Sequence, residues 1–318
     1  MLEPDENRES LKPIKHKDIW NFYKRNLQSI WFVEEVSLVE DIKQWPSIDP
    51  KIKLFLKHIL AFFSGADLLV ATNCQTNFAV EIPYLEAAMF YRFQAFSEDI
   101  HSDMYTTLID SFITDPIEKE KIFKAVTNMP VIKQKTDWMK KYMERESNSL
   151  QKRLVAFAIS EGLFFCSSFA SIFYIRDLGL MPGLSLSNDF ISRDESQHCL
   201  FACLMYKKFK KKLNQDEINE IFTDAVKIES NFVVESIPVS LIGLNAKLMI
   251  EYVKYVADFW IVELGYKKLF FAKNPFSFMQ SINLTRKTNF FEKHSAEYSK
   301  LHDNMDQALS FNNDDEYF

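Results

Sequence analysis

Apolar residues recur at helical spacing over several long segments, and this pattern limits the possible folds more than any other feature of the chain. Each segment is longer than 25 residues and keeps a wide apolar stripe, as helices do when several neighbours cover them. The segments are 49–80, 83–112, 149–176, 187–213 and 245–272. Only 6 Gly and 10 Pro punctuate the 318 residues, and no long stretch alternates with period two. We therefore predict an all-α fold, a bundle of long helices with almost no strand.

Capping residues and breaks in the pattern indicate where helices begin and end. Asp49 followed by proline provides an N-cap and a first helical position, and Ser187 is expected to cap the segment that runs to about Leu213. The stretch from Trp20 to Trp45 mixes charges and aromatic residues, which indicates a short helix and an extended connector. Further helices are predicted at 116–127, 131–146 and 215–235.

The composition along the chain predicts three regions. Residues 1–15 are polar and are expected to form a mobile N-terminal segment. Residues 16–299 are expected to form a single helical-bundle domain. Residues 300–318 end in an acidic stretch and are expected to form a flexible C-terminal tail.

Charge and cysteine content exclude several classes of protein. The net charge is −6, and the longest basic run is interrupted by Phe209, so nucleic acid is not an expected partner. The 4 cysteines form no CxxC pair, which argues against both a disulfide framework and structural zinc. The N-terminus lacks an apolar signal region, and no run of about 18 uninterrupted apolar residues predicts a membrane span. We expect a reduced, cytoplasmic protein.

One pattern of potential metal ligands occurs twice in the long segments. In each copy, a lone carboxylate in an apolar segment precedes a Glu-x-x-His pair by 31 or 34 residues. Residues three apart share a helix face, so each pair can direct an oxygen and a nitrogen at one point. Two helical hairpins of this kind would form a four-helix bundle with the ligands inside. The six residues are Asp67, Glu98, His101, Glu161, Glu195 and His198.

The chemistry of these residues favours two metal ions. A single Glu-x-x-His pair is more often a surface pair than a ligand pair, but Asp67 lies between Phe63 and Leu69 in an apolar stretch. An ionised carboxylate there is costly unless it is paired or bound to metal. Four converging carboxylates would repel one another, and two divalent cations offset that charge. Oxygen and imidazole donors suit iron or manganese, as in the ferritin-like di-iron and di-manganese carboxylate proteins.

Tyr105 lies on the same helix face as this pattern, four residues after His101. A tyrosine at this position is most simply a core residue. Phe165 and Phe169 follow Glu161 by one and two helical turns and are expected to enclose the phenol in a dry pocket. A shielded phenol beside an oxygen-activating metal pair is a candidate for one-electron oxidation.

Several longer stretches resemble one protein family. They are HILAFFSGAD, FYRFQAFSEDIHSDMY, VAFAISEGLFFCSSFASIF, GLMPGLSLSNDFISRDESQHC and NPFSFMQSINLTRKTNFFEK. From about residue 15 onwards the chain resembles the small subunit of eukaryotic-type class I ribonucleotide reductase. The resemblance implies a ferritin-like bundle whose di-metal site and O2 generate a tyrosyl radical. The radical then passes to a large subunit that reduces ribonucleotides to deoxyribonucleotides.

The resemblance also implies roles for individual residues. The six residues of the repeated pattern would bind two iron ions as an oxo-bridged pair, with manganese possible, and Glu98 and Glu195 would bridge. Tyr105 would carry the stable radical. Trp31 and Asp194 would link the site to the radical-transfer route, and Tyr298 would pass the radical on. The C-terminal tail would dock on the large subunit, and the small subunit would form a homodimer.

Two features depart from the family, and two other functions compete. Leu68 follows Asp67 where the family usually has glycine, and the ending NNDDEYF differs from the usual phenylalanine-led heptapeptide. The first alternative is another di-metal oxidase, of the hydroxylase or desaturase type, which needs no radical route. The second is a non-catalytic accessory subunit, which would be expected to lack a ligand or Tyr105; neither is missing here.

Overall fold

Every regular element in the described part of the chain is a helix, which confirms the predicted fold class. The computed structural model describes residues 2, 8–236 and 244–279, and no strand occurs in these ranges. The chain divides into two units, Met1–Pro275 and Phe276–Phe318. In the second unit only residues 276–279 are described, and 277–279 form a helical turn. The predicted mobility of residues 1–15 and 300–318 remains a prediction.

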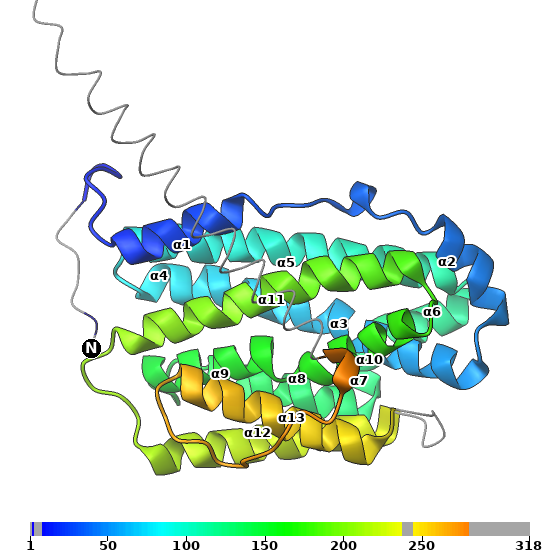
Figure 1. The fold of residues 1–318 in the computed structure, drawn as a ribbon. Helices are drawn as coiled ribbons and strands as arrows, with labels where there is room; N and C mark the ends of the chain where they lie inside the picture. Colours follow the sequence, from blue (N-terminus) through cyan, green and yellow to red (C-terminus); the bar gives the residue numbers. More distant parts are fainter. Residues whose placement is uncertain (1, 3–7, 237–243, 280–318) are drawn as a thin grey trace, which may run out of the picture. The chain divides into compact units, whose positions relative to one another are not determined.

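The first unit contains the helices shown in Figure 1. They are α1 (Lys17–Leu27), α2 (Val39–Gln44), α3 (Pro50–Asn73), α4 (Ala79–Glu81), α5 (Leu85–Phe112), α6 (Pro116–Phe123), α7 (Ala125–Asn128), α8 (Pro130–Met143), α9 (Leu150–Gly162), α10 (Cys166–Asp177), α11 (Pro182–Lys207), α12 (Gln215–Ser236) and α13 (Ala246–Glu263). Short 3-10 turns lie at Val33–Glu35 and Trp45–Ser47, and a π-helical turn at Cys74–Phe78 joins α3 to α4.

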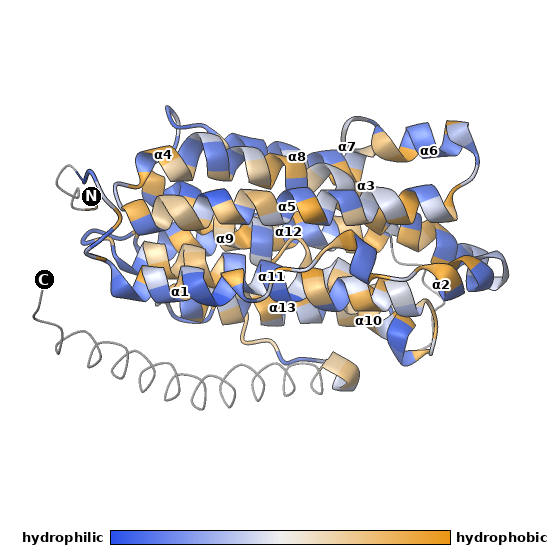
Figure 2. Cartoon of the chain, turned by 90° about the horizontal axis from the view of Figure 1, so that it is seen from above, coloured by the Kyte–Doolittle hydropathy of each residue, from blue (hydrophilic) through white to orange (hydrophobic). Residues whose placement is uncertain are grey.

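Four long helices form the centre of this unit. Helix α3 packs along α5, α9 packs along α11, and α5 also contacts α11. Figure 1 shows α5 and α11 running side by side, and Figure 2 shows hydrophilic and hydrophobic residues interleaved along both. Helices α8, α12 and α13 cover α9. The core of the bundle is rich in aromatic residues, with fully buried rings that include Phe55, Phe62, Phe63, Phe90, Phe164, Phe165, Phe173 and Phe201.

The segment predicted as one helix over 149–176 is two helices. Helix α9 ends at Gly162, and α10 begins at Cys166. Gly162 lies at the break and disfavours a helix interior, but the apolar helical spacing continues past it, so periodicity alone does not reveal the interruption. Side chains from the neighbouring helices α8 and α13 donate hydrogen bonds to the backbone at this interruption.

The last helix of the four also differs from its predicted bounds. It begins at Pro182 instead of Ser187, because the carboxylate of Asp41 accepts hydrogen bonds from the amides of Gly183 and Leu184, both at 2.8 Å. This buried carboxylate does the work of a capping residue from a distant part of the chain. The helix ends at Lys207, six residues before the predicted Leu213.

Helix α13 is shorter than the predicted segment 245–272. It ends at Glu263, and Gly265 then adopts φ 95°, which glycine tolerates best. The chain after the turn is held by Asp258, whose carboxylate accepts hydrogen bonds from the amides of Leu269, Phe270 and Ala272. The residues after Glu263 therefore form a loop, although their apolar residues recur at helical spacing.

Two helical stretches in the described chain are long and apolar enough to cross a membrane by length and composition alone. They are Pro50–Glu81 and Leu150–Asp177, each with a mean hydropathy of 1.6 in its most apolar window. Within the fold, 61% and 94% of those windows are buried. Central helices of a bundle pass the same test, because their neighbours cover them on several sides.

Candidate metal centre

The six predicted ligands lie on the four central helices. Asp67 is on α3, Glu98 and His101 are on α5, Glu161 is on α9, and Glu195 and His198 are on α11. All six side chains are at most 2% exposed. The i, i+3 spacing places the carboxylate and imidazole of each pair on one face, and the packing of the two hairpins turns both faces inward.

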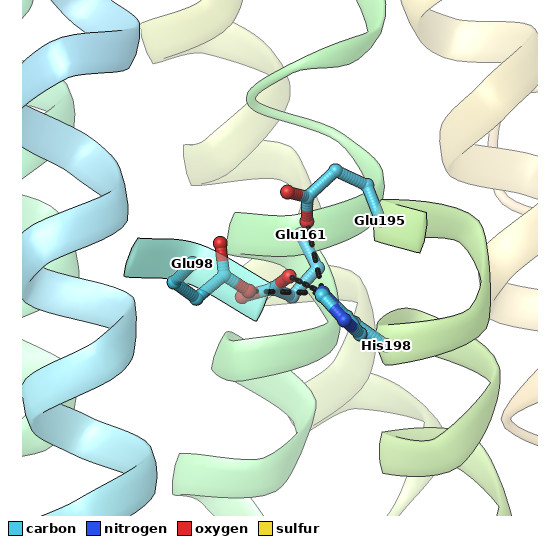
Figure 3. A group of neighbouring side chains, drawn as sticks. All are labelled: Glu98, Glu161, Glu195 and His198. Carbon is cyan, nitrogen blue, oxygen red and sulfur yellow. Dashed lines mark ion pairs between the residues drawn. The ribbon is translucent and has the colours of Figure 1, made fainter. Parts of the chain in front are cut away.

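The side chains gather into two groups that share one residue. Ligand atoms of Glu98, Glu161, Glu195 and His198 lie within 4.8 Å of one another, and Figure 3 shows the carboxylates around the imidazole. The second group contains Asp67, Glu98 and His101, also within 4.8 Å. Glu98 belongs to both groups.

Two of the carboxylates lie between the two imidazoles. Glu98 Oε2 is 3.2 Å from Nδ1 of His101, and its Oε1 is 2.9 Å from Nδ1 of His198. Glu195 Oε1 is 3.0 Å from Nδ1 of His101, and its Oε2 is 3.5 Å from Nδ1 of His198. Glu161 contacts only one imidazole, with Oε2 3.4 Å from His198 Nδ1. The arrangement has two outer carboxylates, Asp67 and Glu161, and two central ones.

The donor set fits a pair of cations. Among the described residues, both oxygens of Asp67 are buried without a hydrogen-bond partner. Burial, together with the charges of Glu98 and Glu195, raises the pKa of Asp67 and that of Glu161 well above the usual carboxyl range. Four carboxyl groups crowded together in the core are unfavourable as anions, and two divalent cations would balance their charge. Carboxylate and imidazole donors suit iron or manganese.

Tyr105 lies beside this cluster in an apolar environment. Its side chain is 2% exposed, and its hydroxyl has no hydrogen-bond partner among the described residues. Its ring stacks on Phe63 at a centroid distance of 4.5 Å. Burial and the charges of Asp67 and Glu195 raise the pKa of the phenol well above its usual value. The phenol therefore stays protonated in a dry pocket.

The predicted enclosure of Tyr105 is indirect. Phe165 and Phe169 pack against Phe63, at centroid distances of 5.3 and 5.2 Å, and of these three rings only Phe63 stacks on the phenol. Sequence reasoning did not assign Phe63 this place. Its position four residues before Asp67 was the available signal, because that spacing puts the two on one face of α3.

Hydrogen bonds connect the cluster to the indole of Trp31. The indole nitrogen donates to Asp194 Oδ2 at 2.8 Å, and the same oxygen lies 3.4 Å from Nε2 of His101. Trp31 is 3% exposed. The guanidinium of Arg193 donates to Asp194 Oδ1 at 3.0 Å and to the carbonyl of Ser29 at 2.7 Å. Arg193 thus connects α11 to the chain just before Trp31. The sequence analysis did not predict this contact.

The charge state of Asp194 follows from these contacts. Burial raises its pKa, but the hydrogen bond with His101 and the charge of Arg193 outweigh burial, so the pKa lies below its usual value. The carboxylate is therefore an ionised acceptor for the indole. Tyr298 and the C-terminal tail lie outside the described residues.

Comparisons with known proteins agree on one family. Residues 8–275 match the family model described as ribonucleotide reductase, small chain. The ribonucleoside-diphosphate reductase small chain of Variola virus is 47% identical over 95% of this chain and 94% of its own length. The subunit M2 of Homo sapiens is 46% identical over 95% of this chain and 77% of its own length.

A solved structure supports the same assignment. The ribonucleotide reductase Rnr4 homodimer from Saccharomyces cerevisiae superimposes with a TM-score of 0.81 at 32% identity, covering 94% of this chain and 92% of that chain. The all-helical ferritin-like bundle and the sequence matches across almost the whole chain lead to one conclusion. The chain belongs to the ribonucleotide reductase small-chain family.

Proposed function

We propose that this chain is the radical-generating small subunit of a ribonucleoside-diphosphate reductase, and that Tyr105 carries its radical. The observation that supports this most is the arrangement of Glu98 and Glu195, each between the same two buried imidazoles, with the phenol of Tyr105 in a dry pocket nearby. The family is one of di-metal enzymes, and the two-metal site is its reactive centre.

Six side chains would hold the two metal ions. Glu98 and Glu195 are the candidates for bridging ligands, because each contacts both imidazoles. The terminal ligands would be Asp67, His101, Glu161 and His198. We propose that these side chains would hold iron as the resident metal, with manganese as the alternative that the same donors accept. When bound, the two ions and O2 supply a one-electron oxidant.

The pocket around Tyr105 suits the storage of a radical. Oxidation of a phenol releases a proton and an electron, and the candidate proton acceptors are the carboxylates whose charges act on Tyr105, Asp67 foremost. The rings of Phe63 and its neighbours keep water and reductants away from the phenol. A neutral tyrosyl radical has no charge to solvate, so an apolar pocket does not destabilise it as it would an ion.

Trp31, Asp194 and His101 form the proposed exit from the site. The carboxylate of Asp194 accepts from the indole and faces the imidazole, so it can move a proton while an electron passes between the metal site and the indole. Tyr298 is the proposed next carrier. An oxidase without a partner needs no such connection, and this favours the reductase over the hydroxylase or desaturase alternative.

The remaining partners follow from the family. We propose that the chain works as a homodimer in the cytoplasm, as a structural relative from Saccharomyces cerevisiae forms a homodimer. A large subunit would bind the nucleotide and receive the radical, with the C-terminal residues 300–318 as the docking peptide. The substrates would be ribonucleoside diphosphates, as in the names of the viral and human relatives.

The test is electron paramagnetic resonance on apo-protein loaded with ferrous iron and exposed to air, alongside Tyr105→Phe. We expect a tyrosyl signal in the wild type and none in the variant, with about two metal ions bound per chain in both. A persisting signal in Tyr105→Phe would disprove the assignment of the radical. Absence of any signal after loading with iron, and then with manganese, would contradict the proposed function.

A further inference from the structure

The helix that carries Glu161 is interrupted directly after it, at Leu163–Phe165 between α9 and α10. The amide of Phe164 bonds to the carbonyl of Ile159, five residues back, at 3.1 Å. The amide of Cys166 reaches the carbonyl of Leu163 at 3.2 Å, whereas in a regular helix it would reach Gly162. Gly162 at the end of α9 weakens the helix at this point. The irregular turn also leaves backbone carbonyls that need partners from elsewhere in the fold.

Two donors from outside the helix bind carbonyls of the interrupted segment. The indole nitrogen of Trp260, on α13, donates to the carbonyl of Gly162 at 3.0 Å. The ammonium of Lys135, on α8, donates to the carbonyl of Phe164. Both carbonyls are buried backbone acceptors, and such groups are unfavourable without a partner. The two side chains therefore stabilise the interrupted form over a regular helix.

The ammonium of Lys135 is itself held in place. Lys135 and Glu229 are both 0% exposed, and Nζ lies 2.8 Å from Oε2 of Glu229 on α12. The hydroxyl of Ser167 donates to the other oxygen of Glu229. The ring centroid of Phe62 lies 3.5 Å from Nζ. A buried ammonium without these partners would be costly, so this donor has little freedom to move away from the Phe164 carbonyl.

Gly162 permits the contact with the indole of Trp260. A Cβ atom at this position would lie 2.4 Å from Nε1 of Trp260 and 2.8 Å from Sγ of Cys199. Only glycine leaves room for α13 and α11 to approach α9 at this point. The close approach brings the indole against the residue next to Glu161.

The two flanks of the interruption face different parts of the site. On one side, Glu161 Oε2 lies 3.4 Å from His198 Nδ1. On the other, the ring of Phe165 packs on Phe63, which stacks on Tyr105. The interruption contains one residue more than a regular helical turn. In a regular helix, Phe165 would therefore be rotated about the helix axis relative to Glu161.

We propose that Lys135 and Trp260 are positioning residues, which keep the α9–α10 helix interrupted and thereby hold Glu161 against the metal pair. The inference rests on the proposed function, in which Glu161 is a metal ligand. Residues that orient a ligand commonly affect metal affinity by 10- to 100-fold, roughly, when they are removed.

The experiment uses manganese(II) as the probe, with the free ion counted by paramagnetic resonance during titration of the apo-protein. Trp260→Phe removes the indole donor and keeps an aromatic ring. Lys135→Met/Glu229→Gln removes the ammonium without leaving an unpaired buried charge. The matched control is Tyr266→Phe, which also deletes a side-chain donor to a backbone carbonyl, that of Leu213 at 2.7 Å.

We expect each test variant to bind the second manganese ion at least about 10-fold more weakly than wild type, and the control to bind as wild type does. The line shape of the bound pair should change in both test variants, since displacement of one carboxylate alters the coupling between the ions. A merely structural role would lower the melting temperature without changing this line shape.

Unchanged affinity and line shape in both test variants would overturn the proposal. If Trp260→Phe does not fold, the Lys135→Met/Glu229→Gln variant decides the question by the same two readouts. A wild-type protein that binds no manganese pair would instead contradict the proposed function. The two failures are therefore distinguishable.

Discussion

The indole nitrogen of Trp31 lies 2.8 Å from Oδ2 of Asp194, although the two residues are 163 positions apart in the chain. The same carboxylate oxygen faces His101, so one buried acid lies between the indole and a candidate metal ligand. Under the proposed function, this connection is what distinguishes a radical-transferring subunit from a self-contained oxidase. It also yields the first prediction.

Trp31→Phe should leave two metal ions bound and reduce turnover with the large subunit to background. Phenylalanine keeps an aromatic ring but has no N–H to donate, and it is much harder to oxidise than an indole. The measurement is deoxyribonucleotide formation in the presence of the large subunit, with metal content determined in parallel. Trp45→Phe is the control, because Trp45 stacks on Phe112 and it is Trp31 whose indole donates to Asp194. Full turnover in Trp31→Phe would exclude this residue from the route.

Tyr105→Phe should not destabilise the apo-protein. The hydroxyl of Tyr105 is buried and has no hydrogen-bond partner among the described residues, so its removal costs no bond and relieves a desolvated polar group. We expect the free energy of unfolding to stay the same or rise by about 1 kcal/mol. Urea unfolding of the two apo-proteins measures this difference. A loss of more than about 1 kcal/mol would mean that the hydroxyl has a partner in solution.

Glu161→Gln should have opposite effects on the apo-protein and on metal binding. Burial and the neighbouring carboxylates raise the pKa of Glu161 well above its usual value, so at neutral pH the folded apo-protein must either take up a proton or hold an unfavourable charge. The neutral amide avoids this cost, so the apo-variant should melt at a higher temperature. Metal binds only the folded state, and it should raise the melting temperature of the wild type more than that of the variant. Calorimetry with and without manganese(II) tests both signs. A lower melting temperature of the apo-variant would show that the contact of Glu161 with His198 outweighs the cost of burying the carboxyl.

Acid should release the segment before α1 from the bundle. The Arg8 guanidinium donates to both oxygens of Glu86 at 2.9 Å, and the amide of Lys15 donates to one of them at 3.0 Å. Burial raises the pKa of Glu86, but these bonds outweigh burial, and the pKa lies below its ordinary value of 4.5. Because the pKa is lower in the folded state, this contribution to stability is complete above pH 4.5 and is lost as the pH falls through the folded-state pKa.

Hydrogen exchange of residues 8–16, followed from pH 6 to pH 3, measures the release. We expect protection of this segment to fall before that of α5. Glu86→Gln is the control, since its amide has no charge to lose and its exchange should vary with pH only through the intrinsic rate. The same pH dependence in Glu86→Gln would assign the release to another group.

Much of the architecture could be predicted because it depends on local periodicity. The lone carboxylates in apolar stretches and the two Glu-x-x-His pairs identify both the central helices and the residues that converge inside them. The spacing of three fixes a shared face whatever the surroundings. The sequence by itself thus determined the fold class, the ligand candidates and the side of α5 on which Tyr105 lies.

Contacts between distant parts of the chain decided the rest. Asp41 sets the start of α11, and Asp258 holds the loop that follows α13. Lys135 and Trp260 interrupt the helix after Glu161. In each case a buried side chain satisfies backbone groups that would otherwise lack partners, at the cost of a helix end or an irregular turn. Periodicity describes only how a segment buries its own face, so it cannot show which distant side chain will reach its backbone. Tertiary packing alone determines that choice.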